Sequence, residues 1–285
     1  MSEFSEGYWT SSDGLRLYYR DYPGANDRLP MLCLHGLTRN ARDFAGLAQR
    51  ISGERRVLCP DMRGRGESEY AKAAESYNVL QYVEDVNLLL DELGIDRFVA
   101  VGTSMGGLMT MLMAMNAPQR IAGAVLNDIG TVLETSGLDR IREYVAQGRN
   151  FPTWVHAARA LAETQGIAHP DFELADWVAM AKRTMTLTSN GRIVLDYDLK
   201  IAEPFLAIDF DNQPDMTPAL TALADTPVLI LRGALSDLLS AETCAAMMTH
   251  LRNAEVVTVP NVGHAPLLTE VEAAAAIDRL LAKTA

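Results

Sequence analysis

The chain has 285 residues, of which 48% are hydrophobic and 22% are charged, so it is long enough for one large α/β domain with an insertion and too short to need two independent cores. Its formal net charge of −12 argues against polyanionic partners, because the average surface would repel nucleic acid and an anionic membrane. No apolar run reaches the roughly 20 residues of a membrane span, and the amino terminus lacks the basic start and apolar core of a secretory signal.

The first part of the chain predicts a hairpin followed by buried strands. Residues 8–10 and 15–19 favour two antiparallel strands, because the turn residues 12–14 lie between them. The apolar runs at residues 31–34 and 56–59 are typical of parallel strands that are covered on both faces. Helical patterns are expected at residues 41–48 and 80–93.

A strand pattern at residues 98–101 then runs into Gly102-Thr103-Ser104-Met105-Gly106, and an apolar helical pattern follows at residues 108–115. In such a turn the strand and helix backbones come close, so a Cβ at Gly102 or Gly106 would clash while Ser104 is held in strained φ/ψ. The turn is expected to push the Ser104 hydroxyl out of the fold. It also places the Met105 amide at a helix N-terminus, where it can act as an oxyanion donor.

The same residues nearly fit the dinucleotide fingerprint G-x-G-x-x-G, as Gly102-x-Ser104-x-x-Gly107. A serine in place of the second glycine would obstruct the pyrophosphate, and the fingerprint usually opens the first βαβ unit rather than lying a third of the way along a chain. We therefore disfavour nucleotide binding.

The second half of the chain first leaves and then resumes the alternation of strands and helices. A strand at residues 121–128 ends in Asp128, and strands at 228–231 and 255–259 come much later. Helical patterns lie at residues 138–147, 153–164, 172–185, 241–251 and 270–282. These elements predict an α/β fold with a mostly parallel, doubly wound sheet, built from residues 1–130 and 219–285, and a helical cap inserted at 131–218.

Several motifs occur at the ends of the predicted core strands in a fixed order. They are His35-Gly36, Asp61-x-Arg63-Gly64-x-Gly66-x-Ser68, the turn at Ser104, Asp237, and Gly263-His264. In this order and context the sequence resembles the α/β-hydrolase family along nearly its whole length. The resemblance implies a triad of Ser104, Asp237 and His264, and an oxyanion hole built from the amides of Leu37 and Met105.

The chemistry of these groups supports the same reading. A serine hydroxyl becomes a nucleophile when a neutral imidazole takes its proton, and a carboxylate fixes the imidazole tautomer. Of the five histidines, His264 is favoured as the base because Gly263 and its loop leave the ring free to reach the serine. Asp128, which ends the strand after the serine helix, is the alternative acid, or else a loop carboxylate that caps backbone amides.

The sequence thus predicts a serine hydrolase that cleaves carboxylic esters of small to medium apolar substrates through an acyl-enzyme. Aromatic residues of the cap are expected to line an apolar pocket or to form the cap's own core. Candidate substrate contacts are His35, Arg39, Trp154 and Trp177. The expected role of His35 is to hold the oxyanion loop by hydrogen bonding, and Arg63 and Arg65 are expected to order their own loop through Asp61 and Glu67.

Other activities on the same fold stay open. Epoxide hydrolases and haloalkane dehalogenases are disfavoured, because they use an aspartate where this chain has Ser104. The alternatives are an enol-lactonase or carbon–carbon bond hydrolase, a cofactor-free perhydrolase, and a non-catalytic ligand receptor. No metal and no cofactor are expected, since the sequence has no H-x-H, H-E-x-x-H or paired cysteines.

Cys33, Cys59 and Cys244 are sparse and lack C-x-x-C spacing, so they are expected to be reduced core thiols of a cytoplasmic protein. The expected partner is a small-molecule ester, with no nucleic acid and no membrane span, and the candidate assembly is a homodimer.

Overall fold

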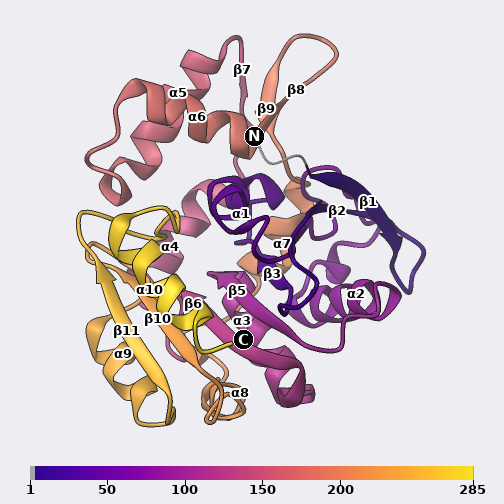
Figure 1. Ribbon diagram of the computed structural model, residues 1–285. Coiled ribbons are helices and arrows are strands. Elements are labelled where there is room, and N and C mark those ends of the chain that lie inside the picture. The colour runs from indigo at the N-terminus through magenta and orange to yellow at the C-terminus, as the bar shows by residue number, and fades with distance from the viewer. Residues whose placement is uncertain (1–3, 285) are drawn as a thin grey trace.

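The computed structural model describes residues 4–284. Residues 1–3, which begin the stretch where we expect no secretory signal, lie outside the described residues. Eight strands form one sheet in the order β1-β2-β4-β3-β5-β6-β10-β11 (Figure 1). They are β1 (Ser5–Thr10), β2 (Arg16–Tyr22), β3 (Met31–Leu34), β4 (Val57–Pro60), β5 (Phe98–Thr103), β6 (Ile121–Asn127), β10 (Val228–Gly233) and β11 (Ala254–Val259).

The sheet is mostly parallel, as predicted. Strand β1 pairs with β2, and β2 with β4, in antiparallel orientation, whereas every pairing from β4 to β11 is parallel. All residues of β3 and β4 are buried. Because helices cover both faces of the parallel part, its strands have continuous apolar runs instead of an apolar-polar alternation.

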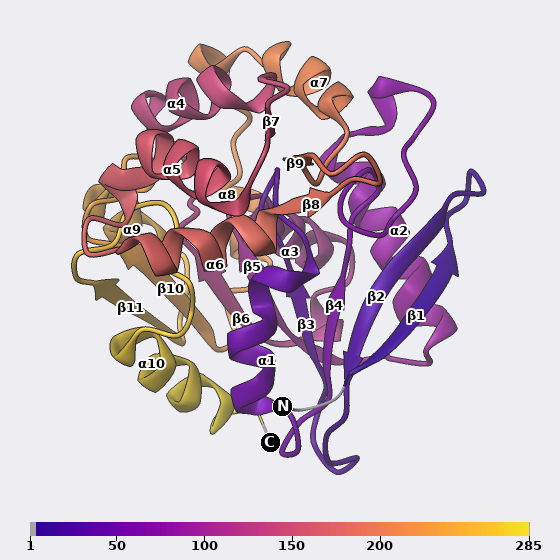
Figure 2. The same cartoon turned by 90° about the horizontal axis from the view of Figure 1, so that it is seen from above.

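Side chains that alternate along the strands enter two separate cores. On one face Leu32, Leu58 and Ala100 pack with helices α2, α3, α8 and α9, and on the other Met31, Val57 and their neighbours pack with α1 and α10. Figure 2 shows α1 and α10 together on one side of the sheet. These helices are α1 (Ala45–Ile51), α2 (Val79–Glu92), α3 (Met105–Asn116), α8 (Thr217–Thr221), α9 (Ala241–Met248) and α10 (Val271–Leu281).

The cap lies between β6 and β10, over the carboxyl ends of the parallel strands (Figure 1). It contains α4 (Thr135–Val145), α5 (Trp154–Gln165), α6 (Leu174–Thr184), α7 (Ala202–Leu206), β7 (Asn150–Phe151), β8 (Met185–Leu187) and β9 (Ile193–Leu195). The small antiparallel sheet β7-β9-β8 and the short helix α7 were not predicted. Strands of two or three residues and a helix of five have too few positions to show a hydrophobic period. The predicted boundary at 218/219 falls inside α8, which packs against α3 of the core.

Short 3-10 helices join several of these elements. They are η1 (Ala41–Phe44), η2 (Ala74–Ser76), η3 (Pro118–Arg120), η4 (Gly166–Ala168), η5 (Leu199–Ile201) and η6 (Phe210–Asn212). The helix expected at residues 41–48 is η1 followed by α1, and the Asn40 side chain caps it by accepting from the Arg42 amide. Among residues 4–284 no helix is long and apolar enough to cross a membrane.

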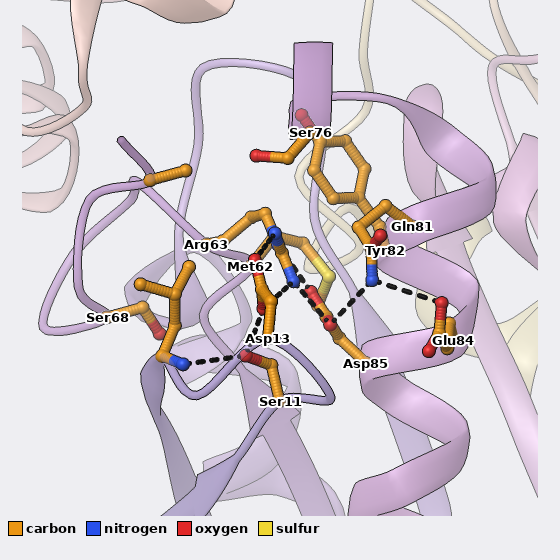
Figure 3. Close-up of polar contacts among 12 residues, drawn as sticks. Ser11, Asp13, Met62, Arg63, Ser68, Ser76, Gln81, Tyr82, Glu84 and Asp85 are labelled. Carbon is orange, nitrogen blue, oxygen red and sulfur yellow. Dashed lines mark hydrogen bonds and ion pairs between the residues drawn. The ribbon is translucent and has the colours of Figure 1, made fainter. Parts of the chain in front are cut away.

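A buried ion-pair network joins the amino-terminal hairpin to helix α2 (Figure 3). Arg63, in the loop after β4, is fully buried and donates from Nε and Nη2 to Asp85 of α2 at 2.7 Å each. It also donates to Asp13, in the turn between β1 and β2, at 2.9 and 3.0 Å. The buried guanidinium is thus satisfied by two carboxylates, one buried on α2 and one at the surface.

The expectation that Arg63 and Arg65 act through Asp61 and Glu67 is wrong. Asp61 accepts instead from the backbone amides of Ala41 and Glu67, at 2.6 and 2.9 Å. Backbone donors satisfy this buried carboxylate, and both arginines have other partners.

The two carboxylates around Arg63 differ in burial and should differ in their effect on stability. The side chain of Asp85 is 1% exposed, and that of Asp13 is 49% exposed. We expect Asp85→Asn to lower the free energy of unfolding by about 3 kcal/mol, because it leaves a buried guanidinium short of a charged partner. Asp13→Asn is the matched control and should cost less than about 1 kcal/mol, because water screens that pair. Urea unfolding of both variants measures the difference, and equal losses would contradict this account.

Candidate active site

Ser104 lies between β5 and α3 with φ of 52° and ψ of −118°, a region that non-glycine residues seldom adopt. A Cβ on Gly102 would lie 2.3 Å from the Gly106 carbonyl oxygen, and one on Gly106 would lie 2.0 Å from that of Leu34. The steric requirement for both glycines is confirmed. The turn presents Ser104 at the carboxyl edge of the sheet, where ligands of open α/β sheets bind.

His264, in the loop after β11, lies between the serine and a carboxylate. Its Nε2 is 3.0 Å from Ser104 Oγ, and its Nδ1 is 2.8 Å from Asp128 Oδ2. From these partners we infer that Nδ1 carries the proton of the neutral ring, because it faces a carboxylate. The lone pair of Nε2 is then free to accept the serine proton.

Asp128 directly follows β6 and is fully buried. Its Oδ1 accepts from the Gly233 amide at 2.8 Å, and its Oδ2 accepts from Ser236 Oγ at 2.6 Å as well as facing His264. Two donors other than the imidazole therefore fix the orientation of this carboxylate.

The predicted partner of His264, Asp237, is corrected to the alternative, Asp128. Asp237 pairs instead with Arg140 of α4, through Nε and through Nη2 at 2.8 Å. Burial works to raise the pKa of Asp237, but the hydrogen bonds and charge of Arg140 outweigh it and lower the pKa. The loop after β10 does reach the site, but its Ser236 side chain faces Asp128 while the next residue faces the cap, an orientation that motif spacing does not reveal.

Two backbone amides beside the serine have no acceptor within residues 4–284: Leu37 N–H, in the loop after β3, and Met105 N–H, the first of helix α3. The first N–H groups of any helix lack an intrahelical acceptor and carry the positive end of its dipole. Leu37 and Ser104 also line one cavity. The amides predicted to form the oxyanion hole are thus unpaired donors.

His35 is fully buried and does not line the cavity, so its candidacy as a substrate contact is corrected. Its Nδ1 lies 2.8 Å from the Gly36 carbonyl oxygen, and its Nε2 accepts from the Met62 amide at 3.0 Å. Burial, followed by the charge of Arg65, lowers the pKa of His35 to about 3. A neutral His35 therefore ties the loop after β3 to the loop after β4.

The cavity beside Ser104 has a volume of about 80 Å³ and lies between the core and the cap. Arg39, Arg140, Tyr144 and His169 contribute to its wall. A second hollow of about 60 Å³ shares Arg39 and Tyr144 with it and is lined mostly by residues of the cap. The wall of this hollow includes the apolar side chains of Phe151, Leu161, Met185 and Leu195.

Trp154 and Trp177 do not line either hollow. Trp177 is 5% exposed and belongs to the apolar core of the cap, and Trp154 packs against that core. Their candidacy as substrate contacts is corrected, because both side chains pack in the apolar cluster of α5 and α6. Of the four candidate substrate contacts, only Arg39 lines the cavity.

Two cavity residues were not singled out from the sequence. Arg140 resembles any surface arginine of an amphipathic helix, so no sequence signal reveals its position. His169 is buried, and burial, ahead of the charges of Arg39 and Arg183, lowers its pKa to about 4, which leaves the ring neutral near pH 7.

Asn127 also went unrecognised. Its amide donates to Thr103 Oγ1 at 3.0 Å and to the Pro266 carbonyl at 2.8 Å, so it joins the strand before Ser104 to the loop after His264. A polar residue at the end of an otherwise apolar strand was the available signal.

The α/β-hydrolase fold family model matches residues 30–271. The chain belongs to this family. As an α/β-hydrolase it is 34% identical over 267 residues to a 3-hydroxybutyrate-oligomer hydrolase of Cupriavidus necator, covering 90% of this chain and 89% of the relative.

Solved structures of this family have the same architecture. A crystal structure of an α/β-hydrolase from Novosphingobium aromaticivorans superimposes with a TM-score of 0.95 at 56% identity, over 99% of each chain. A 2-(acetamidomethylene)succinate hydrolase of Mesorhizobium japonicum is 26% identical and covers 82% of this chain and 81% of the relative. The chain is thus a member of a hydrolase family with hydrolases among its relatives.

The different contacts of Asp128 and Asp237 predict different effects on catalysis. Asp128→Asn should lower kcat/KM for an activated ester by about 10⁴-fold, the loss seen when an asparagine replaces the acid of a serine protease triad and selects the wrong imidazole tautomer. Asp237→Asn, the matched control, should lower it by less than about tenfold, because it only releases Arg140. Steady-state hydrolysis of a p-nitrophenyl ester measures both, and the opposite ranking would reject Asp128 as the acid.

Proposed function

We propose that the protein is a serine carboxylic-ester hydrolase. The observation that carries the proposal is the continuous chain of contacts from Ser104 Oγ through His264 to Asp128, at 3.0 and 2.8 Å. Such a chain converts a hydroxyl into a nucleophile without a metal or cofactor taking part.

In the proposed reaction Ser104 Oγ attacks the ester carbonyl while His264 Nε2 takes its proton. The charge of the imidazolium is stabilised by Asp128. His264 then gives this proton to the departing alcohol, which leaves the acyl group on Ser104. A water molecule, deprotonated by the same imidazole, then attacks the acyl carbonyl. The bond to Ser104 Oγ breaks, the imidazolium returns its proton to Oγ, and the acid is released.

The negative charge on the carbonyl oxygen is proposed to meet the amides of Leu37 and Met105. Their lack of acceptors in residues 4–284 supports this role, because donors that are already oriented need no rearrangement during the reaction. The Met105 amide adds the dipole of α3.

The apolar hollow under the cap supports small to medium apolar groups as the substrate. Arg39 and Arg140 also line the cavity, but each guanidinium is paired with a carboxylate, Asp43 and Asp237 respectively. Near the serine the arginine charges are thus compensated. We therefore propose neutral esters as the substrate class.

A second candidate is an ester that carries a free carboxylate. The two guanidinium groups on the cavity wall favour it, and so does the relative named as a 3-hydroxybutyrate-oligomer hydrolase, since such oligomers are esters that end in a carboxylate.

The nucleophile is tested by labelling. A fluorophosphonate should modify Ser104, and Ser104→Ala should lose labelling and several orders of magnitude in turnover of a p-nitrophenyl ester panel while it keeps the wild-type melting temperature. Labelling at another residue would reject the mechanism. Labelling without any ester turnover would favour a receptor, and turnover of lactones or carbon–carbon substrates alone would favour those hydrolases.

The substrate class is tested with a matched pair of esters, one neutral and one with a free carboxylate. We expect a higher kcat/KM for the neutral ester, and a smaller difference at high salt, because the −12 net charge repels an anion at long range. Arg39→Gln should leave this ranking unchanged. A preference for the carboxylate ester that is lost in Arg39→Gln would establish the second candidate instead.

The homodimer and the cytoplasmic location stay predictions. Light scattering on the purified chain tests the first, and cell fractionation tests the second.

A further inference from the structure

Arg65 is a fully buried cation in the loop after β4. No carboxylate in the described part of the chain forms an ion pair with it. Arg63, two residues earlier, is equally buried but is neutralised by Asp85 and Asp13 (Figure 3). A buried charge is costly without compensation, so the groups that Arg65 does contact need an explanation.

Its contacts reach both residues whose amides are the proposed oxyanion donors. Nε donates to the Leu37 carbonyl oxygen at 2.9 Å, and Nη2 lies 3.9 Å from Met105 Sδ. Nη1 donates to the Arg63 carbonyl oxygen at 2.8 Å and to the Tyr82 hydroxyl at 2.9 Å. The guanidinium carbon also lies 4.7 Å from the centroid of the Tyr82 ring, so a π face supplies part of the missing counter-charge.

The contact with Leu37 completes a pair of anchors on either side of its amide. The preceding peptide is held through the Gly36 carbonyl, which lies 2.8 Å from His35 Nδ1 and accepts from the Arg39 amide at 3.1 Å. The following peptide is held through the Leu37 carbonyl by Arg65. The Leu37 N–H lies in the peptide plane of the Gly36 carbonyl and points away from that carbonyl. By holding the next peptide plane, Arg65 restrains the rotation about the Leu37 backbone bonds that would turn this N–H.

The loop that carries Arg65 is itself attached to the cap. Arg65 forms an isolated antiparallel bridge with Tyr197, in which Gly66 N–H donates to the Asp196 carbonyl at 3.1 Å and Asp198 N–H to the Gly64 carbonyl at 2.8 Å. Arg65 thus has little freedom to move away from the oxyanion loop.

The positive charge of Arg65 also acts electrostatically on this loop. After burial, it is the next largest cause that lowers the pKa of His35, the residue two positions before Leu37. A charge in a dry environment acts over longer distances than one in water, so a developing oxyanion nearby would be attracted by it.

We propose that Arg65 is a positioning residue of the oxyanion hole: it holds the Leu37 peptide, contacts the Met105 side chain, and places a positive charge without a carboxylate partner behind the two amides. This inference rests on the ester-hydrolase function proposed above. Arg65 does not touch the reacting atoms but acts through the two donors.

Three variants test the proposal by steady-state kinetics and by the rate at which a fluorophosphonate modifies Ser104. Arg65→Met should lower kcat and the modification rate by about 10- to 100-fold with KM nearly unchanged, because both reactions place negative charge in the same hole. Arg65→Lys keeps the positive charge but loses the planar guanidinium with its several donors. Its kcat and modification rate should lie between those of Arg65→Met and the wild type.

The matched control is Arg55→Met. Arg55 is also buried, also lacks a carboxylate partner among residues 4–284, and donates to the Leu29 and Thr284 carbonyls at 2.6 and 3.2 Å, at the amino end of β4 and away from Ser104. Its variant should lower the melting temperature but leave kcat and the modification rate unchanged below that temperature. A purely structural role of Arg65 would produce the same pattern as Arg55.

The outcomes are distinct. Unchanged kcat and modification rate in folded Arg65→Met would overturn the proposal. If Arg65→Met does not fold, it is replaced by Arg65→Lys and by Tyr82→Phe, which removes one acceptor of Nη1. An unchanged kcat and modification rate in both of these variants would equally overturn the proposal. If the wild-type Ser104 is not modified at all, the ester-hydrolase function fails and the role of Arg65 fails with it.

Discussion

A single buried carboxylate joins the ends of three strands at the active site. Asp128, at the end of β6, accepts from Gly233 at the end of β10 and from Ser236 in the loop that follows, and it faces His264 in the loop after β11. Buried carboxylates are retained only when hydrogen-bond donors compensate the loss of water, so the three loops must take mutually consistent conformations. The geometry of the serine, the imidazole and the cavity depends on that condition.

The loop after β4 divides two tasks between two buried arginines. Arg63 pairs with two carboxylates, which tie the hairpin to α2 and fully compensate its positive charge. Within the described residues Arg65 has only backbone, hydroxyl, sulfur and aromatic partners, none of which carries a negative charge. Two arginines separated by a single glycine therefore serve stability in one case and, in our proposal, the oxyanion hole in the other.

The cap is attached to the core at the same places that shape the site. The Gly263 amide donates to the Ala168 carbonyl at 2.7 Å, directly before His264, and Arg42 donates to the Arg183 carbonyl at 2.9 Å and pairs with Asp196. These contacts bring Tyr144, Arg140 and His169 over Ser104. The size and polarity of the cavity are therefore properties of the packed cap and core, and neither segment has them alone.

By itself the sequence determined the mostly parallel sheet, the turn at Ser104 and the choice of His264, because continuous apolar runs and closely spaced glycines are local patterns with few structural solutions. The tertiary structure decided which carboxylate faces the imidazole. Asp128 and Asp237 both follow strands that end at the same edge of the sheet. The packing of α4 brings Arg140 to Asp237, while Gly233 and Ser236 hold Asp128 toward the imidazole. It also decided that Trp154 and Trp177 fill the cap and that Arg65 is buried beside Leu37, because these depend on contacts between residues far apart in the chain, to which no local spacing corresponds.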